Sequence, residues 1–239
     1  MRIFKRNYGD FWVLKCDIRK FFYSINPVIL FELMKKYIAD KNILYLTQIL
    51  IFNGPVDNKQ LGIPIGNYTS QFFANIYLNE LDQYIKRELK LKYYVRYMDD
   101  FILLLKTKQD CIDIKRKIEQ FLDEHLQLKL NDKSRYYPYK MGVNFCGYRI
   151  FTTHRLLRIA SKKKIKKSVK KWNLQYNDNT LDFTYSMQSL NSWLGHSSHC
   201  NSYKLQQKIL NSCDFIYSDN TYKKIEQDLI SDITKSTSS

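Results

Sequence analysis

The chain has 239 residues, with 39 Lys and Arg against 23 Asp and Glu, and so carries a formal net charge of +16. An apolar content of 44% and an aromatic content of 15% exclude an intrinsically disordered chain, because disorder requires low hydrophobicity together with high charge. The positive charge favours a polyanionic partner, most often nucleic acid and less often an anionic membrane surface. The alternative is an ordinary protein from a lysine-rich proteome.

Neither a membrane span nor an export signal is expected. The longest apolar runs, such as residues 101–105, fall far short of the roughly 18 to 20 residues that a span requires. The apolar stretch at residues 11–14 is too short for the core of a secretory signal. The cysteines are odd in number and widely spaced, which indicates reduced thiols and a cytoplasmic location. They are Cys16, Cys111, Cys146, Cys200 and Cys213.

The first quarter of the chain predicts one strand and two helices. Residues 11–16 are apolar and aromatic, as in a buried strand, and Asp17 follows directly at its end. Asn26, followed by proline, is typical of a helix start and predicts a helix over residues 28–39. A second helix is expected over residues 43–52.

The middle of the chain predicts a loop, a long helix and a hairpin. Residues 53–67 hold three of the seven glycines, which indicates close backbone approach. Apolar residues recur at helical spacing over residues 70–89. Two apolar runs, residues 93–98 and 101–105, then flank an Asp-Asp pair, and this pattern predicts a hairpin with carboxylates at its tip.

The remaining pattern predicts an α+β sheet domain that carries a C-terminal helical appendage. Residues 162–171 contain seven lysines and begin a stretch that reads as helices with polar breaks. The other expected elements are a helix over residues 109–125, a short strand over 126–130, a hairpin formed by 143–151 and 156–159, and breaks at 177–179 and 218–220.

Asp17, Asp99 and Asp100 converge if their strands are neighbours in one sheet. Crowded carboxylates raise one another's pKa unless a cation lies between them, and Mg²⁺ is the natural partner for such oxygens. Two such ions form the clamp that is used for in-line displacement at phosphorus. The alternative is that Asp17 caps the next helix and Asp99 and Asp100 form an exposed turn; the apolar strands on both sides weigh against it. Glycoside hydrolysis also uses paired carboxylates, but the basic charge fits a phosphate substrate better.

Three segments resemble consecutive motifs of reverse transcriptases in order and spacing. They are residues 15–22 (KCDIRKFF), 62–78 (GIPIGNYTSQFFANIYL) and 96–100 (RYMDD). Residues 130–134 (LNDKS) resemble the lysine-bearing motif of the family, and residues 145–148 (FCGY) resemble its primer-grip hairpin. The resemblance covers roughly residues 11 to 160.

Within that family, the chain resembles enzymes of diversity-generating retroelements. Ile65-Gly66 followed by Ser70-Gln71 is similar to that subgroup, whereas retroviral and group II intron enzymes usually carry Gln before this glycine. Residues 192–196 (SWLGH), with Asn201 nearby, resemble the thumb of the same subgroup.

The resemblance implies a right-hand polymerase fold of the α+β class. Its palm would be an antiparallel sheet with packed helices, accompanied by partial fingers and a C-terminal helical thumb. The implied divisions are a first palm segment at residues 1–26, the remaining fingers at 27–66, the palm with both hairpins at 67–160, and the thumb at 161–239.

The resemblance also implies a two-metal site. Asp17 and Asp99 would hold two Mg²⁺ ions, for which Mn²⁺ is a possible substitute, with Asp100 adjacent and the carbonyl of Ile18 as an extra ligand. One metal would activate the primer 3′-hydroxyl and the other would neutralise the leaving pyrophosphate. Lys133 would neutralise or protonate that pyrophosphate; alternatively it is a solvated lysine in a polar loop.

Four positions near the motif glycine are expected to bind the incoming nucleotide together with Phe22. Phe22 would exclude a 2′-hydroxyl by its bulk, which implies a DNA product; its alternative role is that of a core aromatic. Gly66 would let the backbone approach the nucleotide. Ile65 places an apolar contact where better-known enzymes place an amide, and this predicts low fidelity. Ser70 and Gln71 complete the set.

Two further groups are implied to contact the nucleic acid. The primer grip would comprise Phe145, Cys146, Gly147 and Tyr148. On a helix, four lysines share one face as a possible track for the duplex backbone, although charge runs are usually solvated surfaces. They are Lys163, Lys166, Lys167 and Lys170. Residues 196–200 hold three candidate zinc ligands but lack a fourth, so zinc is not expected.

The implied partners are an RNA template, a DNA or RNA primer, deoxynucleotides and a small basic accessory protein, with no membrane. Only 16 residues precede Asp17, whereas the family usually places a first fingers segment there. A fragment or late start of a longer protein is expected; the alternative is a shortened relative that is weakly active or depends on a partner. The competing function is a reverse-transcriptase-like core of retron, group II intron or abortive-infection type that binds nucleic acid or a partner without polymerising alone.

Overall fold

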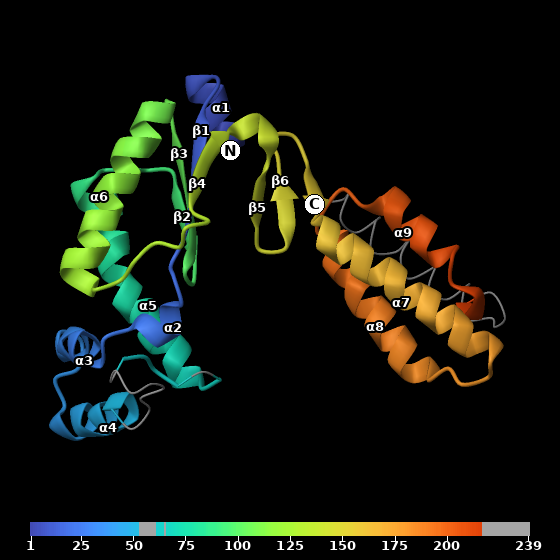
Figure 1. Cartoon of the computed structure of the whole chain (residues 1–239), viewed down its shortest axis with the longest axis horizontal. Coiled ribbons are helices and arrows are strands. Elements are labelled where there is room, and N and C mark those ends of the chain that lie inside the picture. The colour runs from blue at the N-terminus through green and yellow to red at the C-terminus, as the bar shows by residue number, and fades with distance from the viewer. Residues whose placement is uncertain (53–60, 65, 217–239) are drawn as a thin grey trace. The chain divides into compact units, whose positions relative to one another are not determined.

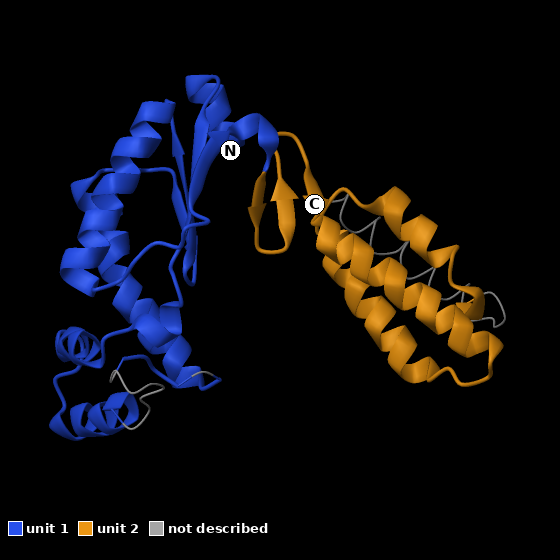
Figure 2. Cartoon of the chain, in the orientation of Figure 1, with its two compact units in different colours: residues 1–142 blue, residues 143–239 orange. Residues whose placement is uncertain are grey.

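The computed structural model describes residues 1–52, 61–64 and 66–216. The chain divides between Gly142 and Val143 into two compact units (Figure 2). Each unit has its own hydrophobic core and is described by itself.

Unit 1 is a four-stranded sheet with helices. Its elements in chain order are α1 (Arg2–Tyr8), β1 (Trp12–Asp17), α2 (Phe21–Ser24), α3 (Pro27–Lys35), α4 (Lys41–Phe52), α5 (Tyr68–Gln83), a π-helix (Tyr84–Glu88), β2 (Tyr94–Tyr97), β3 (Asp100–Leu105), α6 (Lys108–Leu126), β4 (Arg135–Pro138) and a 3-10 turn (Tyr139–Met141).

The sheet is antiparallel, with the strand order β2-β3-β1-β4. Because successive side chains of a strand point to opposite faces, the two faces of β1 lie in different environments. Leu14 and Cys16 are fully buried in the core with residues of α5 and α6, which lie beside the sheet in Figure 1. Lys15 and Asp17 point to the other face and stay partly exposed. One face of β1 therefore builds the core, and the other presents charge.

Two side-chain caps define the helices that follow. The side chain of Asn26 accepts hydrogen bonds from the amides of Val28 and Ile29, which confirms the predicted start of α3. Asp40 accepts from the amides of Asn42 and Ile43 at the start of α4. The prediction that the first helix extends to residue 39 is wrong, because α3 ends at Lys35 and Asp40 already caps the next helix.

The strand predicted over residues 126–130 is absent. Instead α6 continues to Leu126 and ends where Gln127 takes a left-handed φ of 51°. Leu128 and Leu130 are buried alternately, as in a strand, but this segment makes only one isolated bridge, between Leu130 and Ile18. The strand that pairs with β1 on the side away from β3 is β4, which the sequence pattern did not identify.

Gly62 lies where two segments of backbone meet. Its amide donates to the carbonyl of Ile25 at 2.7 Å, and the amide of Ile63 donates to the carbonyl of Phe22 at 2.9 Å. A Cβ at Gly62 would lie 3.2 Å from both the Phe22 oxygen and the Tyr23 Cα, and its φ is +98°. The close backbone approach expected from the glycines of this loop is therefore confirmed at Gly62, whereas Gly66 has open space beside it and residues 53–60 lie outside the described part.

Unit 2 combines a small sheet with a helical bundle. Its elements are β5 (Val143–Phe145), β6 (Tyr148–Ile150), β7 (Arg155–Leu157), α7 (Ile159–Asn177), α8 (Phe183–Ser198), α9 (Tyr203–Leu210) and a 3-10 turn (Asp214–Ile216). The strands pair antiparallel in sequence order. Trp172 of α7, Trp193 of α8 and Phe215 belong to the core between the helices.

The sheet of unit 2 contains a turn that the sequence pattern missed. Residues 143–151 were expected as one strand, but Cys146 and Gly147, with φ of 44° and 87°, form a two-residue turn between β5 and β6. Positive φ at both central positions is the type I′ geometry, which Asn-Gly signals more strongly than Cys-Gly. The predicted turn after residue 151 is present between β6 and β7.

The α+β class is confirmed, with antiparallel sheets in both units. Within the described ranges, no helix has both the length and the apolar character needed to cross a bilayer.

We expect Gly62→Ala to lower the free energy of unfolding by about 2–3 kcal/mol, because left-handed strain adds to a clash with rigid backbone. Gly66→Ala is the matched control: Gly66 has the same φ of +98° but open space where the Cβ would lie, so we expect a loss of only about 1 kcal/mol. Urea unfolding measures both, and equal losses would contradict the packing argument.

Candidate active site

The register of β1 and β3 places two carboxylates opposite each other. Asp17, the last residue of β1, pairs with Asp100, the first residue of β3. Asp99 lies beside them in the two-residue turn between β2 and β3, where Met98 takes a left-handed φ of 55°. The convergence of these three acids, expected from strand adjacency, is present.

Two of the carboxyls are electrostatically unfavourable in the ionised form. The pKa of Asp17 is raised by burial and then by the charges of Asp99 and Asp100, and is lowered in part by Asn131 and Lys15. Burial also raises the pKa of Asp99, with a further contribution from Asp100. This edge of the sheet therefore carries negative charge that its surroundings compensate incompletely.

Lys15 supplies part of the missing positive charge. Its Nζ lies 2.6 Å from Oδ2 of Asp100, and both side chains are about a quarter exposed, at 24% and 29%. The other oxygen, Oδ1 of Asp100, is buried and accepts no hydrogen bond within the described part of the chain. An acceptor in this position has lost water without gaining a donor, which favours a cation as its partner.

The segment after α6 is fixed against Asp17 by side chains that the sequence analysis did not single out. Asn131 donates to Oδ2 of Asp17 at 3.0 Å, and its amide donates to the Asp17 carbonyl at 2.7 Å. The hydroxyl of Ser134 accepts from the amide of Asp17 at 3.1 Å. Lys133 is exposed in this loop, and its amide bonds to the Asn131 side chain. The loop thus carries Lys133 close in the fold to Asp17.

Ile18 follows Asp17, with a side chain that is 1% exposed. The neighbouring backbone hydrogen bonds join the Asp17 carbonyl to the Asn131 amide and the Arg19 amide to the Lys129 carbonyl. Neither of these bonds uses the carbonyl of Ile18. A role for that carbonyl as a metal ligand stays a prediction.

A partly buried ion pair anchors the turn that carries Asp99. The guanidinium of Arg96 donates to both oxygens of Asp82 in α5, at 2.9 and 2.6 Å. A further nitrogen of Arg96 donates to the Met98 carbonyl at 3.0 Å and to Asn75 at 3.1 Å. The Arg96 and Asp82 side chains are 11% and 20% exposed. This bidentate contact connects the turn to the rigid helix beneath the sheet.

The expected nucleotide-binding residues occupy different environments. Phe22 lies in α2, half-buried against the core. Gly66 has a φ of +98° and open space where a Cβ would lie, so its backbone conformation, rather than packing, accounts for glycine. Ser70 is buried at 2% exposure, and Gln71 is exposed in the first turn of α5. Ile65 lies outside the described residues.

The expected primer-grip residues form the tip of the β5–β6 hairpin in unit 2. Phe145 pairs with Tyr148 across the turn made by Cys146 and Gly147. The Tyr148 ring stacks on His196 of α8, and its hydroxyl donates to the His196 carbonyl at 2.8 Å. A Cβ at Gly147 would lie 3.0 Å from the same imidazole. The hairpin is therefore fixed to the helices of its own unit.

Asn201 supports the same small sheet from the other side. Its side-chain oxygen accepts from the Arg155 amide at 3.1 Å, and its own amide donates to the Arg155 carbonyl at 2.9 Å. Asn201 thus makes both hydrogen bonds to the backbone of Arg155 in β7 that a residue of a neighbouring strand would make. This gives a structural role to Asn201, as the stacking contact does to His196, and both belong to the stretch singled out from the sequence.

The lysine face predicted for the thumb is present on α7. Four lysines are exposed, while Ile165, Val169 and Trp172 on the opposite side of the helix are buried. The four are Lys163, Lys166, Lys167 and Lys170. Their contact with nucleic acid stays a prediction.

The donor set suits a hard divalent cation. It consists of carboxylate oxygens, and it includes the orphaned Oδ1 of Asp100. Among the residues that the structure describes, however, no three His, Cys, Asp or Glu side chains surround a common point as metal ligands do. The chemistry of the donors fits Mg²⁺, whereas their present rotamers, with Asp100 paired to Lys15, would have to change.

The family model for reverse transcriptase (RNA-dependent DNA polymerase) matches residues 2–150, more than half of the chain. The chain belongs to the reverse transcriptase family. The match includes β1, the β2–β3 hairpin and the loop that follows α6, and hence every residue of the carboxylate site.

Curated relatives in this family are longer proteins. The putative COX1/OXI3 intron 2 protein of Saccharomyces cerevisiae is 28% identical over 62% of this chain and 25% of its own length. Protein YkfC of Escherichia coli is 27% identical over 58% of this chain and 46% of its own. The group II intron-encoded protein LtrA of Lactococcus lactis is 24% identical over 63% of this chain and 37% of its own. The chain thus spans between about a quarter and a half of these relatives.

Solved structures with the same fold include two yeast telomerases. Telomerase of Candida tropicalis, in complex with a TWJ fragment of telomeric RNA, aligns with a TM-score of 0.53 at 14% identity over 92% of this chain and 42% of that chain. The corresponding Candida albicans structure gives a TM-score of 0.51 at 12% identity, over 94% and 50%. At these identities the likeness shows a reverse transcriptase fold and nothing further.

We expect Asp99→Asn to stabilise the metal-free chain at neutral pH. Burial raises the pKa of Asp99 in the folded chain, so the folded chain binds the Asp99 proton more tightly than the unfolded chain does. This proton binding stabilises the fold fully below the unfolded pKa of about 3.9, and the stabilisation is lost as the pH rises through the raised folded pKa. With screening by solvent, the gain should be about 0.5 kcal/mol, or ~1–2 °C in Tm. Melting with a chelator at pH 7 and pH 3.5 measures it. A gain that persists undiminished at pH 3.5 would contradict the electrostatic cause.

We expect Arg96→Lys and Asp82→Asn each to destabilise the chain by about 2–4 kcal/mol, because each leaves a partly buried charge with a poorer partner. Arg116→Lys is the control, since Arg116 contacts Asp113 in an exposed pair and should change stability by less than ~0.5 kcal/mol. Hydrogen exchange of the amides at residues 98–100 should accelerate in the first two variants only. Unchanged exchange there would show that the ion pair does not hold the turn.

Proposed function

We propose that this chain provides the polymerase core of an RNA-directed DNA polymerase, which copies RNA into DNA by transferring deoxynucleotides to a primer. The observation that supports the proposal most is the pairing of Asp17 with Asp100 next to Asp99, on the sheet face opposite the core. Membership of the reverse transcriptase family supports nucleotidyl transfer as the reaction at these carboxylates. The +16 charge of the chain suits a polyanionic substrate.

In the proposed reaction Asp17, Asp99 and Asp100 hold two Mg²⁺ ions, for which Mn²⁺ would be a substitute. Metal ions at such carboxylates would supply Lewis acidity at the primer hydroxyl and countercharge for the pyrophosphate. Asn131 and Ser134 orient Asp17 through the bonds described above. Lys133, carried by the same loop, would add positive charge near the departing pyrophosphate.

Nucleotide selection is proposed for Phe22 and Gly66. The carbonyl of Phe22 binds the amide of Ile63, which connects the loop before Gly66 to α2. Phe22 would lie against the sugar and exclude a 2′-hydroxyl, while the open space beside Gly66 would admit the nucleotide. Gln71 is exposed and free to reach a ligand, whereas Ser70, being buried, would act by supporting the loop.

The diversity-generating subclass and low fidelity rest on the sequence around Ile65. Replacing the usual amide by an apolar side chain would remove a donor that checks base-pair geometry. The curated relatives include intron-encoded proteins, so an origin in a group II intron is the alternative to a diversity-generating retroelement. The small basic accessory protein is proposed with the same subclass, whereas a cytoplasmic location is proposed from the odd number and wide spacing of the cysteines.

A second candidate function is binding of nucleic acid or a partner without independent polymerisation. The +16 charge and the exposed lysine face of α7 suit it, because both can hold a nucleic acid whether or not a nucleotide is transferred. The chain also spans at most about half of the curated relatives that it matches.

Primer extension on an RNA template with Mg²⁺ and deoxynucleotides tests the proposal. We expect wild type to extend and Asp17→Asn and Asp99→Asn to lose at least ~10³-fold in rate, because each removes a charge from the proposed metal ligands. Asp132→Asn is the control: Asp132 is exposed in the same loop as Lys133 and should leave the rate within about twofold.

The outcomes separate the two functions. If wild type binds a primer–template duplex but does not extend it, the second function holds for this chain. If Asp132→Asn loses as much as the other variants, the loss reflects the loop rather than the proposed ligands. Ile65→Gln with an unchanged error rate would refute the proposed cause of low fidelity.

A further inference from the structure

A second candidate site lies in unit 1 at the opposite end of the sheet from the carboxylates. It is a pocket of about 520 Å³, within the range of roughly 300–1,000 Å³ usual for ligand sites. Its walls include Leu104 and Leu105 at the end of β3, whereas Asp100 begins that strand. Five strand residues span about 17 Å, so the pocket is separate from the proposed catalytic site.

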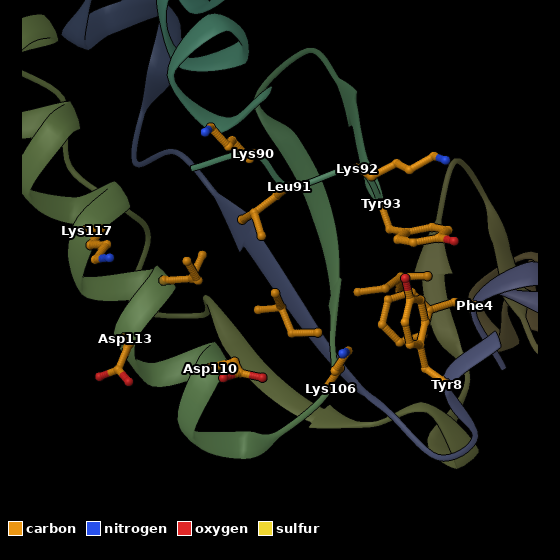
Figure 3. Close-up of a pocket in the computed structure, with 13 residues that line it drawn as sticks. Phe4, Tyr8, Lys90, Leu91, Lys92, Tyr93, Lys106, Asp110, Asp113 and Lys117 are labelled. Carbon is orange, nitrogen blue, oxygen red and sulfur yellow. The ribbon is translucent and has the colours of Figure 1, made fainter. Parts of the chain in front are cut away.

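Four segments that are distant in sequence build the pocket. They are α1, the link between the π-helix and β2, the end of β3, and the first half of α6. Figure 3 shows Phe4, Tyr8 and Tyr93 gathered on one side of the pocket and Lys90 and Lys117 toward the other. The lining therefore combines an aromatic wall with cationic groups.

The aromatic wall is well packed but partly exposed at Tyr8. Phe4 is 3% exposed, and its ring centroid lies 4.7 Å from those of both Tyr8 and Tyr93. Tyr8 remains 46% exposed, and Nζ of Lys106 lies 4.8 Å from its ring centroid. An ordered ring that is still partly open is suited to stacking with a nucleobase, which stabilises binding by about 1–3 kcal/mol per base.

The charge balance of the pocket favours an anion. Asp110 already accepts the Thr107 amide at 3.0 Å in the capping box of α6, and Asp113 accepts from Gln109 at 3.2 Å. In contrast, no ion pair engages the lysines of the pocket among the described residues. They are Lys90, Lys92, Lys106 and Lys117.

Lys90 is held beside the pocket by the end of the preceding helix. Its φ is 53°, the left-handed conformation in which helices commonly end, and it follows the C-cap Leu89 of the π-helix. The amide of Leu91 donates to the Ile85 carbonyl at 3.0 Å and closes this helix end. The conformation thus has a structural cause, and it positions a cationic side chain in the lining of the pocket.

We propose that this pocket binds one nucleotide of single-stranded RNA, with the base against Tyr8 and Tyr93 and the neighbouring phosphates on Lys90, Lys92 and Lys117. Unpaired RNA is recognised by this combination of stacking and cationic contacts. The inference deepens the proposed function, since it places a second contact for the same RNA outside the polymerase site. It requires no polymerisation and is tested by binding alone.

The test uses the full chain and a short fluorescein-labelled oligouridine, with binding followed by anisotropy over a range of salt. We expect Lys90→Asn/Lys92→Gln/Lys117→Gln to weaken binding about tenfold and to reduce the salt slope by about 2, as three phosphate contacts imply. Asn suits the left-handed φ at residue 90. The matched control, Lys41→Gln/Lys86→Gln/Lys108→Gln, removes the same charge from exposed positions outside the pocket and should change affinity by less than ~2-fold.

Cross-linking locates the site directly. At an RNA concentration below the wild-type Kd, a 4-thiouridine oligonucleotide should cross-link to Tyr8 or Tyr93 in wild type and in the control triple variant, and about tenfold less in the pocket triple variant. Thermal melting confirms that the variants are folded. Equal losses of affinity in the two triple variants, cross-links only outside the pocket, or stronger competition by a glutamate-rich peptide than by unlabelled RNA would overturn the proposal.

Primer extension separates this proposal from the proposed function. The pocket triple variant should extend a pre-annealed short duplex at the wild-type rate. If wild type does not extend at all, the polymerase proposal fails, while the binding and cross-linking results still decide whether the pocket holds RNA.

Discussion

The structure of unit 1 depends on the central position of β1, which pairs with β3 on one side and β4 on the other. Its register with β3 sets Asp17 against Asp100 and, on the reverse face, buries Leu14 and Cys16 under the helices. A shift of one residue would exchange these two faces, placing carboxylates in the core. The hydrophobic packing of this strand therefore enforces the geometry of the acidic site.

Around β1, the contacts that shape the site come from helices and loops rather than from the acids themselves. Arg96 connects the turn of Asp99 to Asp82 in α5, and Asn131 fixes one oxygen of Asp17. Lys15 balances Asp100 in the metal-free protein. Burial, and after it the neighbouring carboxylates, raises the pKa values of Asp17 and Asp99, so a divalent cation at these oxygens would favour their ionised forms.

Much of this arrangement could be predicted from the sequence, because strand patterns are local and the Asp99-Asp100 pair stands between two clear apolar runs. The Asn26 cap was likewise visible, since a cap and the helix it starts are adjacent. Asn131 and Ser134 belong to a recognised motif, but their hydrogen bonds to Asp17 could not be predicted, since Asp17 lies more than a hundred positions away. The strand predicted over residues 126–130 was wrong because Leu128 and Leu130 alternate with polar residues, which is also the pattern of a strand. In the structure a left-handed Gln127 ends α6 there.

The hydrogen bonds that join Asp17 to the loop after α6 have a consequence for folding. The acidic site unites residues near 17, 100 and 131, so it exists only after most of unit 1 has closed its long-range contacts. Chains with such non-local contacts order late and cooperatively. A nascent or partly unfolded chain would therefore lack the assembled carboxylates, and the affinity of the site for a cation would report on the cooperative completion of the fold.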